Sequence, residues 1–181
     1  IPLFVNSEVT KINETDGKVS GVEIIIEGEP KTITSDAVVV TTGSYGSNHE
    51  MIESFRPDLK GYVSTTAASS TGDGIKMIEQ LGGATVDMDQ IQIHPTVEQE
   101  TSYLITEAVR GEGAILVNSK GERFVNELET RDKVSAAINA LDPNYAYVIF
   151  DDALKDRVKA IAQYEEKGLV KNISSELMYS M

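Results

Sequence analysis

The chain contains no cysteine and no tryptophan, and only two histidines occur among its 181 residues. Without cysteine there can be no disulfide, no thiolate nucleophile and no cysteine-ligated zinc or iron–sulfur centre. The two histidines, His49 and His94, lie far apart in the sequence, so a histidine-rich metal site is not expected either. We therefore predict no metal site in this chain.

Long hydrophobic runs and positive charge are also scarce. No apolar run approaches the roughly 20 residues that a membrane-spanning helix needs, and no signal peptide is recognisable. The chain has 16 Lys and Arg against 29 Asp and Glu, a net charge of −13, which argues against nucleic acid or an anionic membrane surface as a partner. The chain begins Ile-Pro-Leu without methionine, so we expect a piece of a longer protein, and its compartment is unknown.

Alternating and β-branched segments predict an antiparallel meander at the start of the chain. The hairpin signals are Asp16-Gly17 and Glu27-Gly28, and Val9 and Ile12 are the positions expected to be buried. The expected strands are residues 8–13, 18–26 and 31–34.

Two glycine-containing loops follow. The apolar run 37–41 predicts a central strand buried on both faces, and its Thr42-Gly43 turn could bring backbone close to a cofactor. The alternative is a plain strand-to-helix turn. In the loop 71–74, Asp73 is either a helix N-cap or part of a cofactor clamp. A carboxylate there would repel a diphosphate, so a hydroxyl or a ring N–H is its more reasonable partner.

The remaining pattern is mixed, which predicts an α+β fold. Helices are expected at residues 49–55, 75–81, 133–140 and 153–164, with a further one from Ser175. In the helix 153–164, the predicted apolar face consists of Leu154, Val158, Ile161 and Ala162. Short strands are expected at residues 3–5, 84–86, 90–93, 114–117, 123–125 and 145–150.

Five polar residues stand in apolar or glycine-rich surroundings within forty positions: His94, Thr106, Glu107, Arg110 and Arg131. Buried groups of this kind must pair with each other or with a charged ligand. The cluster is what a site for a small dianion that receives a proton would need. Two simpler explanations remain open, since His94 could be a hydrogen-bonded core residue and Glu107 and Arg110 could form an i,i+3 pair.

These residues lie in motifs that closely resemble one family. The segments IQIHPT, ITEAVRGEGAILVN, GERFVNE and TRDKVSAAI resemble the flavoprotein subunit of soluble fumarate reductases and flavocytochrome c, with succinate dehydrogenase and L-aspartate oxidase as more distant relatives. The upstream segments VVVTTGSYG and TGDGIKM are similar to flavin-contacting segments of that family. The resemblance covers nearly the whole chain.

The resemblance implies the architecture and the cofactor. Residues 1–85 would be the C-terminal part of a split FAD-binding domain, and residues 86–181 a truncated capping domain that closes over the substrate. FAD would be the cofactor. By the same resemblance, its contacts would be Val9, Thr42, Gly43, Gly72 and Asp73.

The resemblance also implies the chemistry of fumarate reduction to succinate. Arg131 would deliver the proton, Glu107 and Arg110 would return one to it, and His94, Thr106 and Glu107 would bind one substrate carboxylate. The electron donor is an unidentified domain or protein. Alternatives are a reductase of another enoate, of the urocanate or acrylate type, and a non-catalytic flavin-domain fragment. We expect this piece alone to be inactive and to hold flavin weakly.

Overall fold

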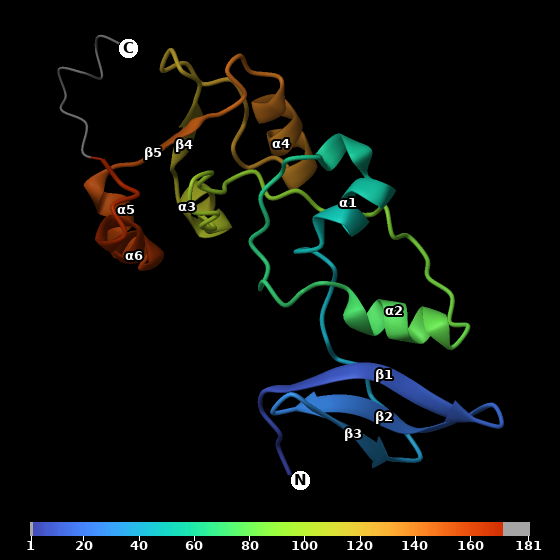
Figure 1. Cartoon of the computed structure of the whole chain (residues 1–181). Helices are drawn as coiled ribbons and strands as arrows, with labels where there is room; N and C mark the ends of the chain where they lie inside the picture. Colours follow the sequence, from blue (N-terminus) through green and yellow to red (C-terminus); the bar gives the residue numbers. More distant parts are fainter. Residues whose placement is uncertain (1, 172–181) are drawn as a thin grey trace. The chain divides into compact units, whose positions relative to one another are not determined.

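The computed structural model describes residues 2–171, which divide into two compact units between Gln90 and Ile91. Each unit combines helices with antiparallel strands, which confirms the α+β prediction (Figure 1). The helix expected from Ser175 lies outside the described residues. Within residues 2–171, no helix has the length and apolarity needed to cross a membrane.

The first unit contains the predicted meander. Its strands β1 (Ser7–Thr15), β2 (Lys18–Ile26) and β3 (Glu29–Thr34) pair antiparallel in chain order. The strands predicted at residues 8–13, 18–26 and 31–34 are therefore confirmed, and the first and third are slightly longer than expected.

The two hairpin turns explain this register. Asp16 and Gly17 have φ of 53° and 76°, and Glu27 and Gly28 have φ of 54° and 81°. Two successive residues with positive φ define the type I′ turn, whose twist matches that of the flanking strands. Glycine in the second position accepts this conformation without steric cost.

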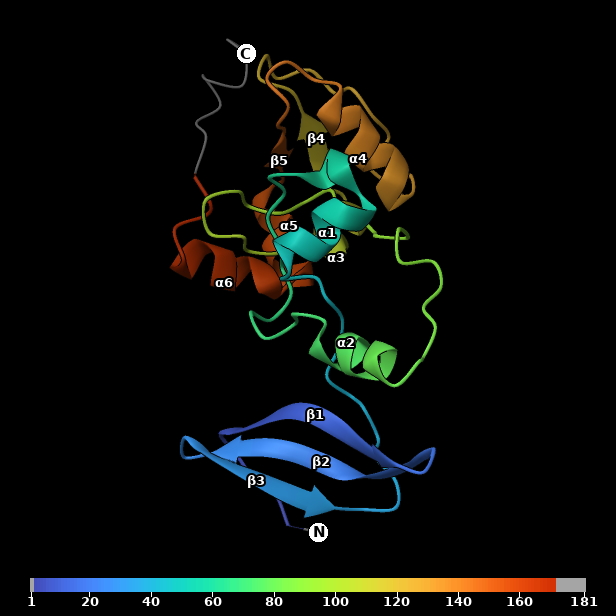
Figure 2. The same cartoon turned by 45° about the vertical axis from the view of Figure 1, so that its right-hand side comes forward.

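Helix α2 (Asp73–Gln80) packs against β1, as both views of the chain show (Figures 1 and 2). Ile12 on β1 and Met77 on α2 are buried, so the prediction for Ile12 is confirmed. Val9 pairs with Ile24 of β2 but remains 38% exposed on the edge strand, so its predicted burial was wrong.

The predicted central strand at residues 37–41 does not form. This segment has no β-ladder partner among residues 2–171, and Val39 is 84% exposed. A continuous apolar strand needs neighbouring strands to satisfy its N–H and C=O groups. The segment therefore runs as irregular chain into the loop before α1 (His49–Phe55).

Helix α1 begins and ends where the sequence predicts. The Asn48 carboxamide oxygen accepts a hydrogen bond from the Met51 amide at 3.0 Å, as an N-cap does. A single 3₁₀ turn, η1 (Pro57–Leu59), follows.

The second unit is built from short elements. They are α3 (Glu107–Gly111), β4 (Ile115–Val117), α4 (Arg131–Asn139), β5 (Tyr147–Ile149), α5 (Asp152–Arg157) and α6 (Ala160–Glu166). Strand β4 pairs antiparallel with β5, which is 30 residues away, and makes only a single bridge to Arg123. The return strand expected at 123–125 was therefore wrong, as were the strands expected at 3–5, 84–86 and 90–93.

A core beside α3 holds the second unit together. Its buried members are Val109, Ala114, Leu154, Val158, Ile161 and Tyr164. The helix expected over residues 153–164 is interrupted at Val158, whose φ of −116° and ψ of 89° are not helical. The break brings Tyr164 into the core, whereas Ala162 of the predicted apolar face is exposed.

Candidate active site

Two helix starts carry the charged cluster. Glu107 is the first residue of α3 and Arg131 the first residue of α4, with Thr106 and Thr130 in the N-cap positions. A carboxylate suits the positive end of a helix, but a guanidinium there is disfavoured by the helix dipole. The position of Arg131 is therefore explained by its partner and not by the stability of α4.

That partner is Glu107. Its Oε2 accepts hydrogen bonds from Arg131 Nη2 at 2.8 Å and Nε at 3.3 Å, and its Oε1 accepts one from Arg131 Nε at 3.2 Å. Oε1 also accepts one from Arg110 Nη2 at 2.9 Å. One carboxylate thus joins two guanidiniums, and hydrogen bonding by Arg131 holds the pKa of Glu107 below its ordinary value.

Gln92 holds the other side of Arg131. The Gln92 Oε1 atom accepts a hydrogen bond from Arg131 Nη1 at 2.7 Å. All three guanidinium nitrogens of Arg131 are therefore engaged while its side chain remains 37% exposed. The hydrogen bond to Glu107 raises the pKa of Arg131 above its ordinary value, so the resting side chain holds its proton.

Arg110 is the buried member of the cluster, at 2% exposure. Its Nη1 donates to the backbone oxygen of Glu127 and its Nη2 donates to Glu107. The Arg110 Nε atom is buried and has no partner among the described residues. The Glu107 carboxylate is therefore the counter-ion that makes burial of this charge tolerable.

Glu127, whose backbone oxygen accepts from Arg110, is itself held in place through its side chain. This carboxylate is 4% exposed and accepts from the Leu116 amide at 2.8 Å and from Arg123 Nη2 at 2.7 Å. Burial alone would raise the pKa of Glu127, but the hydrogen bonds from Arg123 and the Leu116 amide bring it below its usual value. The ionised Glu127 ties the chain before α4 to β4.

His94 lies beside this cluster in a partly buried position. Its Nδ1 accepts a hydrogen bond from the Thr96 amide at 3.3 Å, so the neutral ring carries its hydrogen on Nε2. Burial lowers the pKa of His94 below its ordinary value, and the positive charge of Arg131 lowers it further. His94 is therefore a neutral donor at physiological pH.

This pKa shift predicts how stability depends on pH. Because the folded-state pKa of His94 is depressed, the unfolded chain binds the proton more tightly, and stability is lost as pH falls from about 6.5 through the folded pKa. We expect the melting temperature to fall less between pH 7.5 and 5.5 in His94→Gln than in the wild type. Thermal unfolding measures this, and His49→Gln, at the exposed start of α1, is the matched control. Equal slopes in the wild type and His94→Gln would contradict the assignment.

The structure thus brings together most of the cluster that the sequence singled out. Glu107, Arg110 and Arg131 share hydrogen bonds, and the predicted i,i+3 pair of Glu107 and Arg110 is one part of that network. Thr106 is adjacent, but its amide donates to the Tyr164 hydroxyl at 2.8 Å and its side chain forms no helix cap.

Three supporting residues were not anticipated: Gln92, Glu127 and Tyr164. Gln92 alternates with two isoleucines in IQIHPT, which places it on the same side of an extended segment as His94. Tyr164 follows Ile161 by three residues, the spacing of one helix face. No helical or strand periodicity marks Glu127, because it lies in the loop before α4, and the path of that loop determines its partners.

The two glycine-containing loops of the first unit lie together. The Gly72 amide donates to Ser44 O at 3.2 Å, and the Asn48 carboxamide donates to Thr71 O at 2.9 Å. Thr42, Gly43 and Asp73 are exposed on these joined loops. Of the two alternatives for Asp73, the N-cap was wrong, because Gly72 holds that position and Asp73 is the first residue of α2. Asp73 accepts from the Thr71 hydroxyl at 2.6 Å.

Close packing explains the glycine at position 72. It has φ of 80°, and a Cβ there would lie 2.8 Å from Met51 Sδ and 2.9 Å from Tyr45 Cβ. Any side chain would push the two loops apart. Gly43 differs, because a Cβ there would meet only Ser70 Oγ at 3.7 Å, so its surroundings are open.

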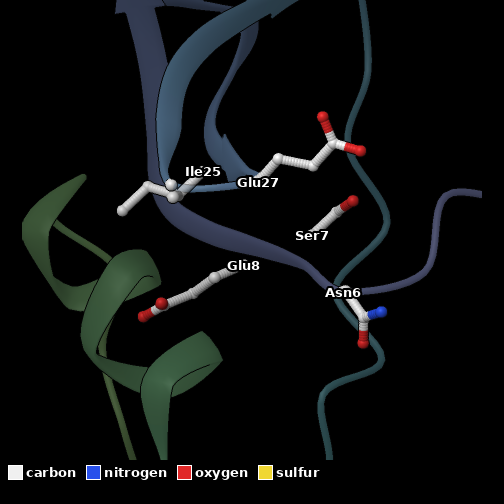
Figure 3. Close-up of a pocket in the computed structure, with 6 residues that line it drawn as sticks. Asn6, Ser7, Glu8, Ile25 and Glu27 are labelled. Carbon is white, nitrogen blue, oxygen red and sulfur yellow. The ribbon is translucent and has the colours of Figure 1, made fainter.

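A separate hollow of about 620 Å³ lies at one end of the sheet and is lined by Asn6, Ser7, Glu8, Ile25, Glu27 and Gly28. Figure 3 shows Glu8 directed toward the helix on one side, whereas Glu27 and Ser7 point to the other. The two carboxylates do not converge. Among residues 2–171 no group of three or more His, Asp or Glu could hold a metal ion.

Comparison with known proteins gives consistent matches along the chain. A family model described as FAD binding domain matches residues 1–176. The chain is 48% identical over 176 residues to NADH:fumarate oxidoreductase of Klebsiella pneumoniae (strain 342), a match that covers 97% of this chain and 19% of that protein. It is 41% identical over 179 residues to fumarate reductase (cytochrome) of Shewanella frigidimarina, covering 97% of this chain and 31% of that protein.

A solved structure agrees with these sequence matches. The open conformation of a flavocytochrome c3 fumarate reductase superposes with a TM-score of 0.73 at 40% identity, covering 88% of this chain and 29% of that chain. The chain thus spans less than a third of the length of these relatives. The family model covers nearly all of it, and the chain belongs to the FAD binding domain family.

Proposed function

We propose that this chain is part of an FAD-dependent enoate reductase that reduces fumarate to succinate. The observation that carries the proposal is the Glu107 carboxylate, which joins the exposed guanidinium of Arg131 to the buried guanidinium of Arg110. Such an arrangement can present a proton and then replace it. The similarity to fumarate reductases supports the choice of substrate.

Residues 1–85, which lie within the first unit, would be the FAD-binding part and contribute to the flavin site. The joined loops fit such a role, because exposed backbone at Thr42 and Gly43 leaves room for a planar ring to approach. Asp73 would then face a ring N–H or a hydroxyl, since a diphosphate would be repelled. Val9, on β1, would be a further contact. When bound, reduced FAD would supply the hydride.

Residues 86–181, which include the whole second unit, would be the capping part, with Arg131 as the acid. Arginine is ordinarily locked in its protonated form, so it can act as an acid only beside groups that stabilise its brief deprotonation. The hydrogen bonds from Arg131 to Gln92 and Glu107 fix the orientation of the guanidinium before the proton is given up. A closed cap would exclude water and strengthen these interactions.

Glu107 and Arg110 would return the proton. Oε1 of Glu107 accepts from Arg110 Nη2 and from Arg131 Nε, at 2.9 and 3.2 Å, so one oxygen contacts both guanidiniums. A proton lost by Arg131 can be replaced through this oxygen without a change in fold. The low pKa of Glu107 keeps the carboxylate ionised and ready to accept between turnovers.

His94 and Thr106 would bind one substrate carboxylate. The Thr96 amide occupies Nδ1 of His94, which leaves Nε2–H as the donor. The Thr106 hydroxyl forms no cap with α3 and is a second donor. Donors held against a carboxylate withdraw charge from the conjugated alkene and stabilise the enolate-like charge that develops when hydride arrives.

A survey of acceptors tests the proposed function. We expect the complete flavoprotein that contains this chain to oxidise reduced methyl viologen with fumarate and to yield succinate. Urocanate and acrylate serve as parallel acceptors, because a related enoate reductase would use the same acid. If the protein reduces urocanate or acrylate but not fumarate, the proposed substrate is wrong and the reaction class stands. If it reduces none of the three, it is not an enoate reductase.

The chain alone is expected to bind flavin weakly. It spans less than a third of its relatives, and its loop contacts would cover only part of a dinucleotide. We expect the purified 181-residue chain to lack a stoichiometric flavin absorption band after gel filtration with excess FAD. A band corresponding to one flavin per chain would contradict this expectation.

A further inference from the structure

The two-residue segment Ile105–Thr106 leads directly into α3 and so determines where Glu107 begins. Thr96 holds one side of this segment: the Ile105 amide donates to Thr96 O at 3.0 Å, and the Thr96 hydroxyl donates to Ile105 O at 2.9 Å. On the other side, the Thr106 amide donates to the Tyr164 hydroxyl at 2.8 Å. Every one of these bonds lies within the second unit.

Tyr164 is well placed to act as a fixed support. It is 5% exposed and belongs to the core that also contains Val109 of α3 and Ile161 of α6. Its ring meets that of Tyr103 edge to face, with centroids 5.9 Å apart. A buried phenolic oxygen needs a hydrogen-bond partner, and an amide at the start of a helix lacks one within the helix. The Thr106–Tyr164 bond satisfies both groups.

We propose that Tyr164 is a positioning residue that keeps Glu107 in register with Arg110 and Arg131. The Glu107 carboxylate meets both guanidiniums at distances between 2.8 and 3.3 Å, so a displacement of its backbone of about 1 Å would break part of this set. The Tyr164 hydroxyl prevents such a displacement by anchoring the preceding amide. This proposal rests on the proposed function.

The test compares two hydroxyl deletions in the complete flavoprotein. Tyr164→Phe removes the oxygen that accepts from Thr106 and keeps the ring in the core. Tyr103→Phe is the matched control, because the neighbouring ring loses an oxygen whose hydrogen bond within residues 2–171 is a long one, 3.4 Å, donated to Gln163 Oε1. Rates are expressed per bound flavin, so a loss of folded protein does not count as a loss of turnover.

We expect Tyr164→Phe to lower kcat about 10-fold and to increase the solvent deuterium isotope effect on kcat, because a displaced Glu107 slows the return of the proton. Tyr103→Phe should match the wild type in kcat and in the isotope effect. A Tyr164→Phe protein with wild-type kcat and isotope effect would overturn the proposal, even if it melts earlier, since a purely structural role moves only the melting temperature. A wild type that reduces no enoate would instead refute the proposed function, and this inference with it.

Discussion

Replacing Arg131 with alanine is expected to reduce fumarate turnover by about 1,000-fold or more while bound flavin is retained. A general acid contributes roughly 100- to 10,000-fold to a rate, and Arg131 would also neutralise charge that develops on the substrate. Since Arg131 belongs to the second unit and the loops proposed to contact flavin belong to the first, its removal should leave the flavin spectrum unchanged. Steady-state oxidation of reduced methyl viologen, normalised to flavin absorbance, measures the effect.

Two further variants separate the role of Arg131 from its charge. Arg157→Ala removes an arginine of the same unit that lies 3.9 Å from Glu112, outside the cluster, and should leave turnover unchanged. Arg131→Lys keeps the charge, but an ammonium cannot reproduce the planar fork that meets Glu107 and Gln92 at once, so we expect a loss close to that of the alanine variant. Wild-type turnover in Arg131→Ala would exclude Arg131 as the acid.

The parts of the fold that sequence predicted well are those set by local contacts. Turn residues with positive φ at Asp16-Gly17 and Glu27-Gly28 fix the meander, and Asn48 fixes the start of α1. The expected strand at 37–41 failed because a strand depends on partners elsewhere in the chain. Strand β4 illustrates the same point, since it forms a ladder with β5 and only a single bridge to the nearby segment 123–125.

The same distinction between local and distant contacts applies to the candidate site. Residue types and apolar context selected Glu107, Arg110 and Arg131, which the structure joins by hydrogen bonds, although only Arg110 is buried. Gln92 and Tyr164 were missed because their bonds to Arg131 and Thr106 span 39 and 58 positions. Periodicity reports which face of an element is buried, but it does not report which distant side chain meets that face.

Replacing Glu107 with glutamine is the change most informative about proton return. Glutamine has nearly the same size, but it offers one acceptor oxygen in place of two and turns an amide N–H toward a guanidinium. Arg110, 2% exposed, would lose its only carboxylate partner among residues 2–171, and the hydrogen bond that raises the pKa of Arg131 would be weakened. We therefore expect steady-state kcat to fall about 100-fold.

The first turnover should behave differently. Arg131 is protonated at rest, so a pre-reduced Glu107→Gln enzyme can still deliver one proton, and only the reloading of Arg131 is impaired. We expect rapid reoxidation of one equivalent of flavin on mixing with fumarate in a stopped-flow experiment, followed by slow turnover. Glu112→Gln, one turn beyond the cluster and 51% exposed, should show neither defect. A first turnover slowed as much as the steady state would mean that Glu107 orients Arg131 and does not reload it, whereas unchanged steady-state turnover would remove Glu107 from the proton path altogether.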